Sequence, residues 1–129
     1  MEFKDSVAII TGGASGLGEA TTRKFHSQGS KVCIFDLDNL RGKKLEKELG
    51  ENCVYFSVDV CSEPDLLEAI NAVINRFNKI NININCAGIA LAEKTLGEEG
   101  SHNLSRFKKI IEVNLIGTFN ILRLCAEKM

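Results

Sequence analysis

The chain has 129 residues, and its 16 Lys and Arg against 17 Asp and Glu leave a formal net charge of -1. Hydrophobic residues make up 44% and charged residues 26%, which is typical of a single soluble globular domain and excludes a disordered chain. The near-neutral charge favours a small-molecule or protein partner over nucleic acid. No window reaches the roughly 18 apolar residues of a membrane span, so we expect no membrane insertion.

Targeting and metal-binding signals are weak in this sequence. Residues 1–5 match neither a signal peptide nor an Arg-rich transit peptide. The cysteine number is odd and no Cys-x-x-Cys pair occurs, which favours a reducing compartment without a disulfide framework; the cysteines are Cys33, Cys53, Cys61, Cys86 and Cys125. His26 and His102 have no companion ligands, so we expect no metal site.

Strand-like and helix-like segments alternate along the chain. Short apolar runs, typical of strands buried on both faces of a parallel sheet, occur at residues 7–10, 32–35, 53–58 and 80–86. Helical patterns lie between and after them, at residues 16–28, 40–49 and 62–77 and from about 104 onward. The alternation predicts one domain over residues 1–129, an α/β fold of Rossmann type. We expect a doubly wound parallel sheet in three α/β/α layers, with strand order 3-2-1-4.

Several helix ends carry sequence signals. Asn39 is expected to cap the helix at residues 40–49, which Gly50 ends. Ser62, followed by Pro64, has the pattern that opens a helix. The glycine-containing segment at residues 97–102 is expected to be a loop.

A glycine-rich loop, with the sequence TGGASGLG, joins the first strand to the first helix. Gly12 permits the tight turn, Gly16 allows a pyrophosphate to approach the backbone, and Gly18 lets the helix pack closely on the sheet. The free N–H groups near Gly16 and Leu17 then face the phosphates, and the Ser15 hydroxyl adds a donor. The position of the loop between strand and helix favours a dinucleotide over an unliganded turn.

Other features narrow the choice of cofactor. Glu19 stands where a nucleoside-triphosphate loop needs Lys, which excludes that motif. Asp36 ends the second strand, where a carboxylate accepts hydrogen bonds from ribose hydroxyls and repels the 2′-phosphate of NADP. Leu37 follows it and the glycine loop has no Lys or Arg, so the pattern predicts NAD. A helix-capping role is the alternative for Asp36, although Asp38 or Asn39 could fill it equally well.

Three further segments are weak signals in isolation. Asp59 and Val60 follow the third strand, and the small residues Ala87 and Gly88 after Cys86 would let a nucleotide lie against the backbone. Asn114 lies within the last helical pattern, where Asn is disfavoured and an exposed polar position is the alternative interpretation.

Taken in order, these residues resemble the short-chain dehydrogenase/reductase family. The family pattern Thr-Gly-x-x-x-Gly-x-Gly corresponds to residues 11–18, and its Asn-Asn-Ala-Gly to residues 85–88, with Cys86 in the second Asn position. The resemblance is greatest to the branch that oxidises 3-hydroxyacyl-CoA thioesters and hydroxysteroids with NAD, and Lys94, Thr95 and the loop to His102 also match that branch.

The resemblance implies a role for each matching residue. Ser15 and Leu17 would bind the pyrophosphate, Asp36 the ribose, Asp59 and Val60 the adenine, and the Cys86 backbone would lie near the second ribose. Asn114 would order the last helix and a water of the catalytic proton relay. A homotetramer, a small alcohol or ketone substrate and a mitochondrial location are also implied, while the lack of a presequence leaves a cytoplasmic location open.

Two departures from the family pattern stand out. The family uses a Ser and a Tyr-x-x-x-Lys pair after the position of Asn114, and the sole tyrosine here, Tyr55, has Asp59 four residues on. We therefore expect the cofactor-binding N-terminal half of such an enzyme, inactive alone. The alternatives are a non-catalytic NAD-binding or protein-interaction module and a truncated product with no stable fold. In the fourth strand, Asn83 stands where an apolar residue is expected, at a cost of roughly 1–3 kcal/mol if its amide is unsatisfied.

Overall fold

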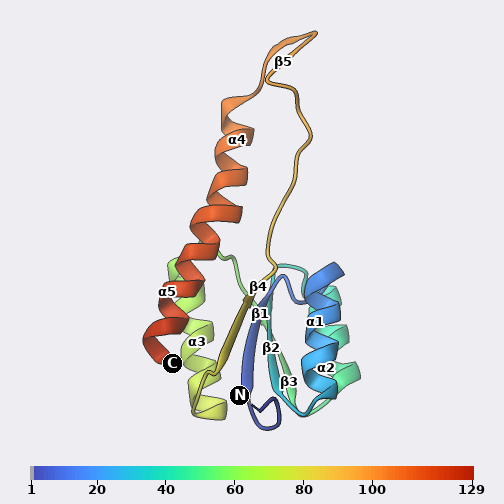
Figure 1. Ribbon diagram of the computed structural model, residues 1–129, viewed down its shortest axis with the longest axis vertical. Coiled ribbons are helices and arrows are strands. Elements are labelled where there is room, and N and C mark those ends of the chain that lie inside the picture. Colours follow the sequence, from blue (N-terminus) through green and yellow to red (C-terminus); the bar gives the residue numbers. More distant parts are fainter. Residues whose placement is uncertain (1) are drawn as a thin grey trace.

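The computed structural model describes residues 2–129 and contains a four-stranded parallel sheet (Figure 1). The strand order β3-β2-β1-β4 confirms the predicted order. The neighbouring strands are all parallel, and their bounds are β1 Val7–Thr11, β2 Lys31–Asp36, β3 Cys53–Ser57 and β4 Ile82–Asn85.

Helices cover both faces of this sheet and produce the predicted three layers. One face carries α1 and α2, and the other carries α3 and α5 (Figure 1). The helix bounds are α1 Gly16–Ser27, α2 Asn39–Leu49, α3 Glu63–Phe77, α4 Leu104–Ile111 and α5 Thr118–Lys128. The structure therefore confirms the Rossmann-like α/β fold.

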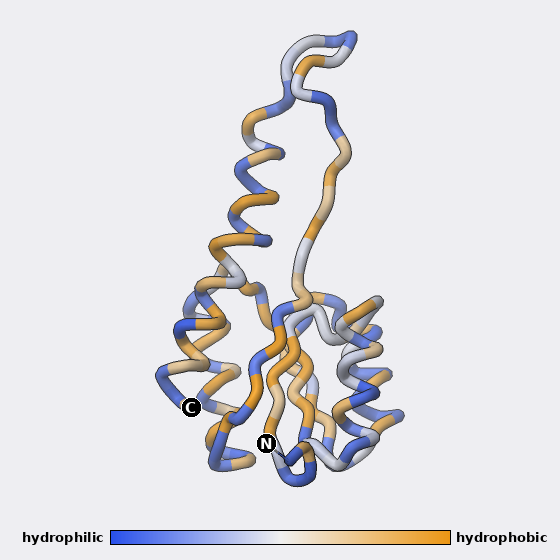
Figure 2. The backbone as a smooth tube through the Cα atoms, viewed as in Figure 1, coloured by the Kyte–Doolittle hydropathy of each residue, from blue (hydrophilic) through white to orange (hydrophobic). Residues whose placement is uncertain are grey.

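The sheet divides the core into two apolar layers. The strands of the sheet are themselves largely hydrophobic (Figure 2). Ile9 and Phe35 face α3 and α5, whereas Ile10 and Ile34 face α1 and α2. All four side chains are buried. This burial on both faces explains why β1 and β2 are continuous apolar runs rather than alternating ones.

The predicted cap of the second helix was wrong. Asp38, not Asn39, caps α2, and its carboxylate accepts a hydrogen bond from the Arg41 backbone N–H at 3.0 Å. Asn39 is already helical, and its side chain contacts the Tyr55 hydroxyl instead. The predicted start of α3 is confirmed, because the Ser62 hydroxyl accepts from the Asp65 N–H.

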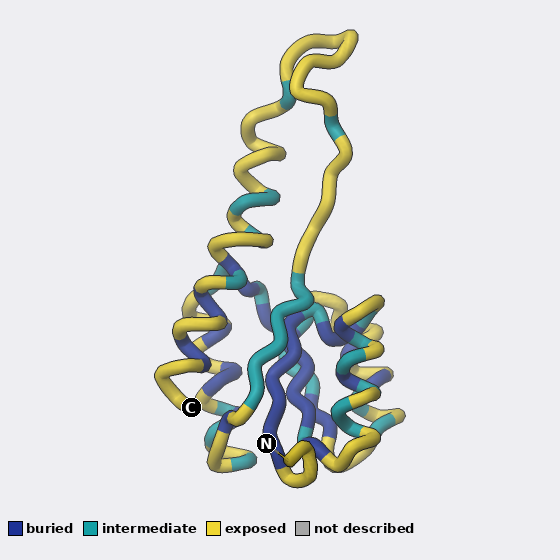
Figure 3. Tube along the Cα trace, in the orientation of Figure 1, coloured by how far each residue is buried: buried dark blue, intermediate teal, exposed yellow. Residues whose placement is uncertain are grey.

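The chain after β4 forms an extension that projects from the body of the molecule and is largely exposed (Figures 1 and 3). It contains an antiparallel hairpin of β5, Leu96–Gly97, and β6, Gly100–Ser101, where the sequence predicted only a loop. The expected continuous last helix is interrupted by a π-helical segment, η1, Glu112–Gly117, between α4 and α5.

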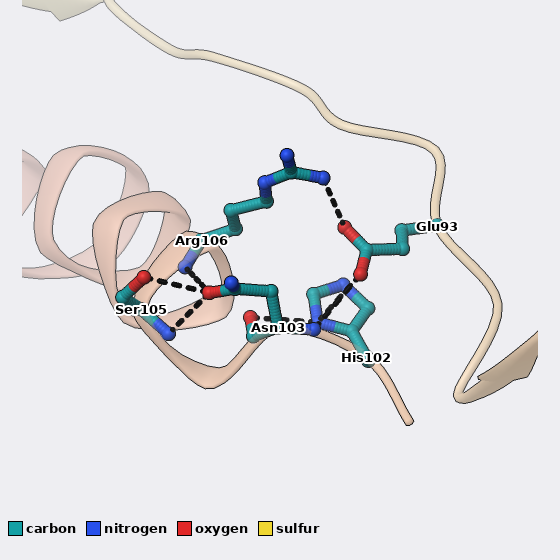
Figure 4. A network of polar contacts seen from close by, with 5 residues as sticks. All are labelled: Glu93, His102, Asn103, Ser105 and Arg106. Carbon is teal, nitrogen blue, oxygen red and sulfur yellow. Dashed lines mark hydrogen bonds and ion pairs between the residues drawn. The ribbon is translucent and has the colours of Figure 1, made fainter. Parts of the chain in front are cut away.

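A polar network fixes the start of α4 against the irregular segment that contains Glu93 (Figure 4). The Glu93 carboxylate accepts hydrogen bonds from the Asn103 N–H at 2.8 Å and from Arg106 at 3.2 Å. The Asn103 side chain in turn accepts from the N–H groups of Ser105 and Arg106 and caps the helix. The Asn103 donor and the Arg106 guanidinium lower the pKa of Glu93.

Strand β4 is an edge of the sheet and carries the unusual Asn83. The Asn85 amide donates to the Asn83 side-chain oxygen at 3.0 Å. Among residues 2–129, the Nδ2 of Asn83 and the Oδ1 of Asn85 have no hydrogen-bond partner although both atoms are buried. The buried Asn83 amide nitrogen is therefore unsatisfied, which is the condition for the energetic cost expected from the sequence, and it lowers the stability of this edge.

We predict that Gly42→Ala changes stability in opposite directions depending on residue 55. A Cβ on Gly42, in the middle of α2, would lie 2.2 Å from the Tyr55 ring, so the substitution should destabilise the protein by about 1–3 kcal/mol. In a Tyr55→Val background the clash is removed, and helix propensity should make the same substitution stabilising by about 0.5–1 kcal/mol. Urea denaturation of the four proteins measures both effects. The same sign in both backgrounds would contradict the packing of Tyr55 on Gly42.

Buried thiols predict a loss of stability at alkaline pH. Burial raises the pKa of Cys53 and of Cys125 from 9.0 to about 12. Unfolding therefore releases protons between pH 9 and about 12, and the free energy of unfolding falls as the pH rises through that window. Urea denaturation at successive pH values measures the slope, which should be smaller for Cys125→Ala than for the unmodified protein. An equal slope would contradict the burial of this thiol.

Candidate functional site

A cavity of about 530 Å³ lies at the carboxyl ends of the parallel strands, at the point where the order of the sheet diverges from β1 to β2 and to β4. This is the position where doubly wound sheets bind their ligands. The structure brings every residue predicted to bind the dinucleotide to its wall: Gly12, Ser15, Gly16, Leu17, Gly18, Asp36, Leu37, Asp59, Val60, Cys86, Ala87 and Gly88. Their binding role stays a prediction.

Close backbone packing shapes the floor of this cavity. Gly12 has a φ of +62°, and a Cβ there would lie 2.8 Å from the Cys86 carbonyl carbon and the Ala87 nitrogen. A Cβ on Gly18 would lie 2.0 Å from the Gly12 carbonyl oxygen. Both positions therefore require glycine, because the atoms that would be hit belong to the backbone and cannot move aside. The glycine spacing seen in the sequence follows from these two contacts.

The N-terminus of α1 opens onto the same cavity. Ser15 precedes the helix in an extended conformation, and no side chain caps the first turn. Gly16 has a φ of +52°, and no atom lies within 4 Å of the position a Cβ would take. The first backbone N–H groups of α1 and the positive end of its dipole are thus available to an anionic group.

Asp36, at the end of β2, is held rigidly by two backbone donors. One oxygen of its carboxylate accepts a hydrogen bond from the Ala14 N–H in the glycine loop at 3.0 Å. The other accepts from the Asp38 N–H in the following turn at 2.9 Å. A carboxylate has about four acceptor positions, so these bonds leave capacity for the hydroxyls of a ligand. The alternative capping role for Asp36 is filled by Asp38.

The segment after β3 provides the part of the cavity wall that contains Asp59 and Val60. The Asp59 carboxylate accepts from the Cys61 N–H at 2.9 Å, which closes a short turn after the strand. Lys109, from α4, also lines the cavity, and its ammonium group lies 3.0 Å from a Glu112 carboxylate oxygen. That ion pair raises the pKa of Lys109.

Asn114 does not line the cavity, but it forms hydrogen bonds with Ile89, which does. Its side-chain oxygen accepts from the Ile89 N–H at 2.9 Å, and its amide donates to the Ile89 carbonyl at 2.8 Å. This two-bond clamp joins the π-helical segment to the chain leaving β4. Asn114 is exposed, as the alternative interpretation held, but its side chain is engaged by both of these bonds. Its implied role in ordering a water stays a prediction.

Sequence reasoning missed several lining residues: Phe35, Val58, Ile89, Lys109 and Val113. Phe35 and Val58 directly precede the predicted Asp36 and Asp59 in the sequence, and this adjacency could have identified them as lining residues. Ile89, Lys109 and Val113 line the cavity from the chain that leaves β4, the end of α4 and the start of η1, which are distant from the glycine loop in the sequence. Tyr55 lies outside the cavity wall, although its hydroxyl donates to the Asp36 carbonyl at 2.8 Å.

Within residues 2–129, no group of three or more His, Cys, Asp or Glu side chains is arranged to hold a metal ion. Across the same residues, no helix has the length and apolar character needed to cross a bilayer.

We predict that Gly18→Ala lowers the free energy of unfolding by about 1–3 kcal/mol or more, because its Cβ would collide with the Gly12 carbonyl. Gly16→Asn is the matched control. It faces open space, and Asn tolerates the positive φ, so its stability should stay close to that of the unmodified protein. Thermal denaturation measures both variants, and a Gly18→Ala protein as stable as the control would disprove the close approach of α1 to the loop.

Comparisons with known proteins agree with this geometry. Residues 6–129 match the family model for short chain dehydrogenases. The chain is 44% identical over 128 residues to human 3-hydroxyacyl-CoA dehydrogenase type-2, and 41% identical over 129 residues to that of Drosophila melanogaster. These alignments cover 98% of this chain and 49% and 51% of the relatives, so the chain spans about half the length of the curated relatives it matches.

Solved structures show the same fold. A 3-hydroxyacyl-CoA dehydrogenase type-2 from Mycobacterium avium matches 98% of this chain and 49% of its own, with a TM-score of 0.90 at 37% identity. A 3-ketoacyl-(acyl-carrier-protein) reductase from Brucella melitensis, complexed with NADH, matches 98% of this chain and 51% of its own, with a TM-score of 0.90 at 29% identity. The glycine loop, the sheet order and these likenesses together show that the chain belongs to the short chain dehydrogenase family.

Proposed function

We propose that the cavity binds NAD and that the chain is the cofactor-binding part of an oxidoreductase that passes hydride from a secondary alcohol to NAD. The observation that carries this proposal is the Asp36 carboxylate, held by the Ala14 and Asp38 N–H groups beside the open N-terminus of α1. The NADH complex of the Brucella melitensis relative supports a nicotinamide cofactor.

Different residues bind four parts of the dinucleotide. The N–H groups at Gly16 and Leu17 and the Ser15 hydroxyl hold the pyrophosphate, because the helix N-terminus attracts anionic oxygens. Asp36 accepts hydrogen bonds from the adenosine ribose, and its charge repels a 2′-phosphate. Asp59 and Val60 border the adenine, and Cys86, Ala87 and Gly88 border the second ribose. When bound, NAD supplies the hydride acceptor.

The substrate class follows from the relatives. Those named 3-hydroxyacyl-CoA dehydrogenase type-2 favour a 3-hydroxyacyl-CoA thioester, and a hydroxysteroid is the second candidate that the family branch implies. The 129 residues contain no Tyr-x-x-x-Lys, the pair that serves as acid/base in this family. We therefore propose that these residues bind the cofactor and that turnover needs catalytic residues from outside this sequence. The same resemblance supports a homotetrameric assembly and a mitochondrial location as proposals.

Cofactor binding can be tested by titrating the protein with NADH, with NADPH as the comparison. The chain has no Trp, so the emission of the reduced nicotinamide is free of interference from tryptophan. We expect saturable NADH binding and much weaker NADPH binding. Asp36→Ala should weaken NADH binding about tenfold or more, the value of a hydrogen bond to a charged group, and should reduce the preference for NADH.

Glu51→Ala is the matched control, because it removes an exposed carboxylate from the opposite end of the sheet. It should leave both affinities unchanged. If Asp36→Ala also leaves both unchanged, Asp36 is not the ribose-binding acid, and if neither nucleotide binds the unmodified protein, the proposal for the cavity is wrong.

A further inference from the structure

The Tyr55 hydroxyl ties β3 to the turn that carries Asp36. It donates to the Asp36 backbone carbonyl at 2.8 Å and lies 3.0 Å from the Asn39 side-chain oxygen. These two partners stand at the beginning and the end of the turn formed by residues 36–39, between β2 and α2. One hydroxyl therefore contacts both ends of this turn.

The turn in question also sets the position of the Asp36 carboxylate. One of the two donors to that carboxylate, the Asp38 N–H at 2.9 Å, lies within it. Leu37 and Leu40 are 64% and 82% exposed, so the apolar side chains of this segment do not anchor it to the core. The Val58 N–H also donates to the Asp36 carbonyl at 3.2 Å, at the beginning of the turn. The Tyr55 hydroxyl adds a contact that reaches the end of the turn, at Asn39.

The Tyr55 ring fits against α2 only because residue 42 is glycine, which lowers the stability of that helix. Gly42 lies in the middle of α2, where glycine costs about 1 kcal/mol relative to alanine. Any Cβ there would collide with the Tyr55 ring at 2.2 Å. A phenylalanine ring would fill the same space, so what the tyrosine adds over phenylalanine is the hydroxyl and its two contacts.

The hydroxyl also keeps its proton. Burial, followed by the nearby Asp36 and Asp38 carboxylates, raises the pKa of Tyr55 against the effect of Ser57. The group therefore stays a hydrogen-bond donor at neutral and mildly alkaline pH.

We propose that Tyr55 is a specificity-determining positioning residue: its hydroxyl fixes the turn at residues 36–39 so that the Asp36 carboxylate faces an unsubstituted ribose 2′-hydroxyl and rejects a 2′-phosphate. This inference rests on the proposed function, in which the cavity binds NAD. Tyr55 touches no part of the cofactor and acts through Asp36. Without the hydroxyl the turn loosens, and the carboxylate can move away from a 2′-phosphate instead of opposing it.

The test is the ratio of the dissociation constants for NADPH and NADH in the protein carrying Tyr55→Phe. We expect this ratio to fall about threefold to tenfold, the fold-change that corresponds to one neutral hydrogen bond. Ser27→Ala is the matched control. It removes another hydroxyl that donates to a backbone carbonyl at 2.8 Å, at the far end of α1, and should leave the ratio unchanged.

A second variant keeps the test decisive if Tyr55→Phe does not fold. Asn39→Ala removes the other partner of the hydroxyl at an exposed position and should lower the ratio in the same direction. A variant that weakens both nucleotides by the same factor, or neither, overturns the inference, because a purely structural role would not alter the ratio. If the unmodified protein does not bind NADH, the proposed function itself fails, which is a separate outcome.

Discussion

The close approach of helix α1 to the end of strand β1 is the constraint on which the candidate site depends. The Gly18 backbone lies so near the Gly12 carbonyl that any Cβ would sit 2.0 Å from its oxygen. This contact places the first turn of α1 at the cavity wall that Asp36 also lines. Every other element of the site is arranged around that helix terminus.

Two hydrogen-bonded connections extend this constraint to the neighbouring strands. The Gly12 N–H donates to the Phe35 carbonyl at 2.8 Å, and the Ala14 N–H donates to the Asp36 carboxylate at 3.0 Å, which couples the loop to β2. On the other side, the Ala87 N–H donates to the Thr11 hydroxyl at 3.2 Å. The loop is therefore held from both sides by the ends of β2 and β4.

The sequence was sufficient to predict the sheet order and most of the cavity wall, because both depend on local patterns. Apolar runs identified β1 and β2, and the spacing of Gly12, Gly16 and Gly18 identified the loop. The cap of α2 was mispredicted because Asp38 and Asn39 have nearly equal capping propensities, and the Tyr55 contact, which only the fold reveals, occupies Asn39.

The extension and the last helix were the parts that sequence patterns could not resolve. Hairpin β5–β6 has only two residues in each strand, too few for a periodic signal. The sequence of the π-helical segment also suits a regular helix, so its pattern did not predict the interruption. In the structure, Asn114 of this segment forms two hydrogen bonds with Ile89. Lys109 and Val113 join the cavity through this long-range folding, which no motif encodes.

The most direct test of the cofactor site is a crystal structure of the protein with NAD bound. We expect the pyrophosphate over the first turn of α1 and the adenosine ribose within hydrogen-bond distance of the Asp36 carboxylate. The carboxylate should keep its bonds to Ala14 and Asp38. NAD bound with its ribose away from Asp36, or in a different cavity, would contradict the central claim that the glycine loop and this carboxylate together form the cofactor site.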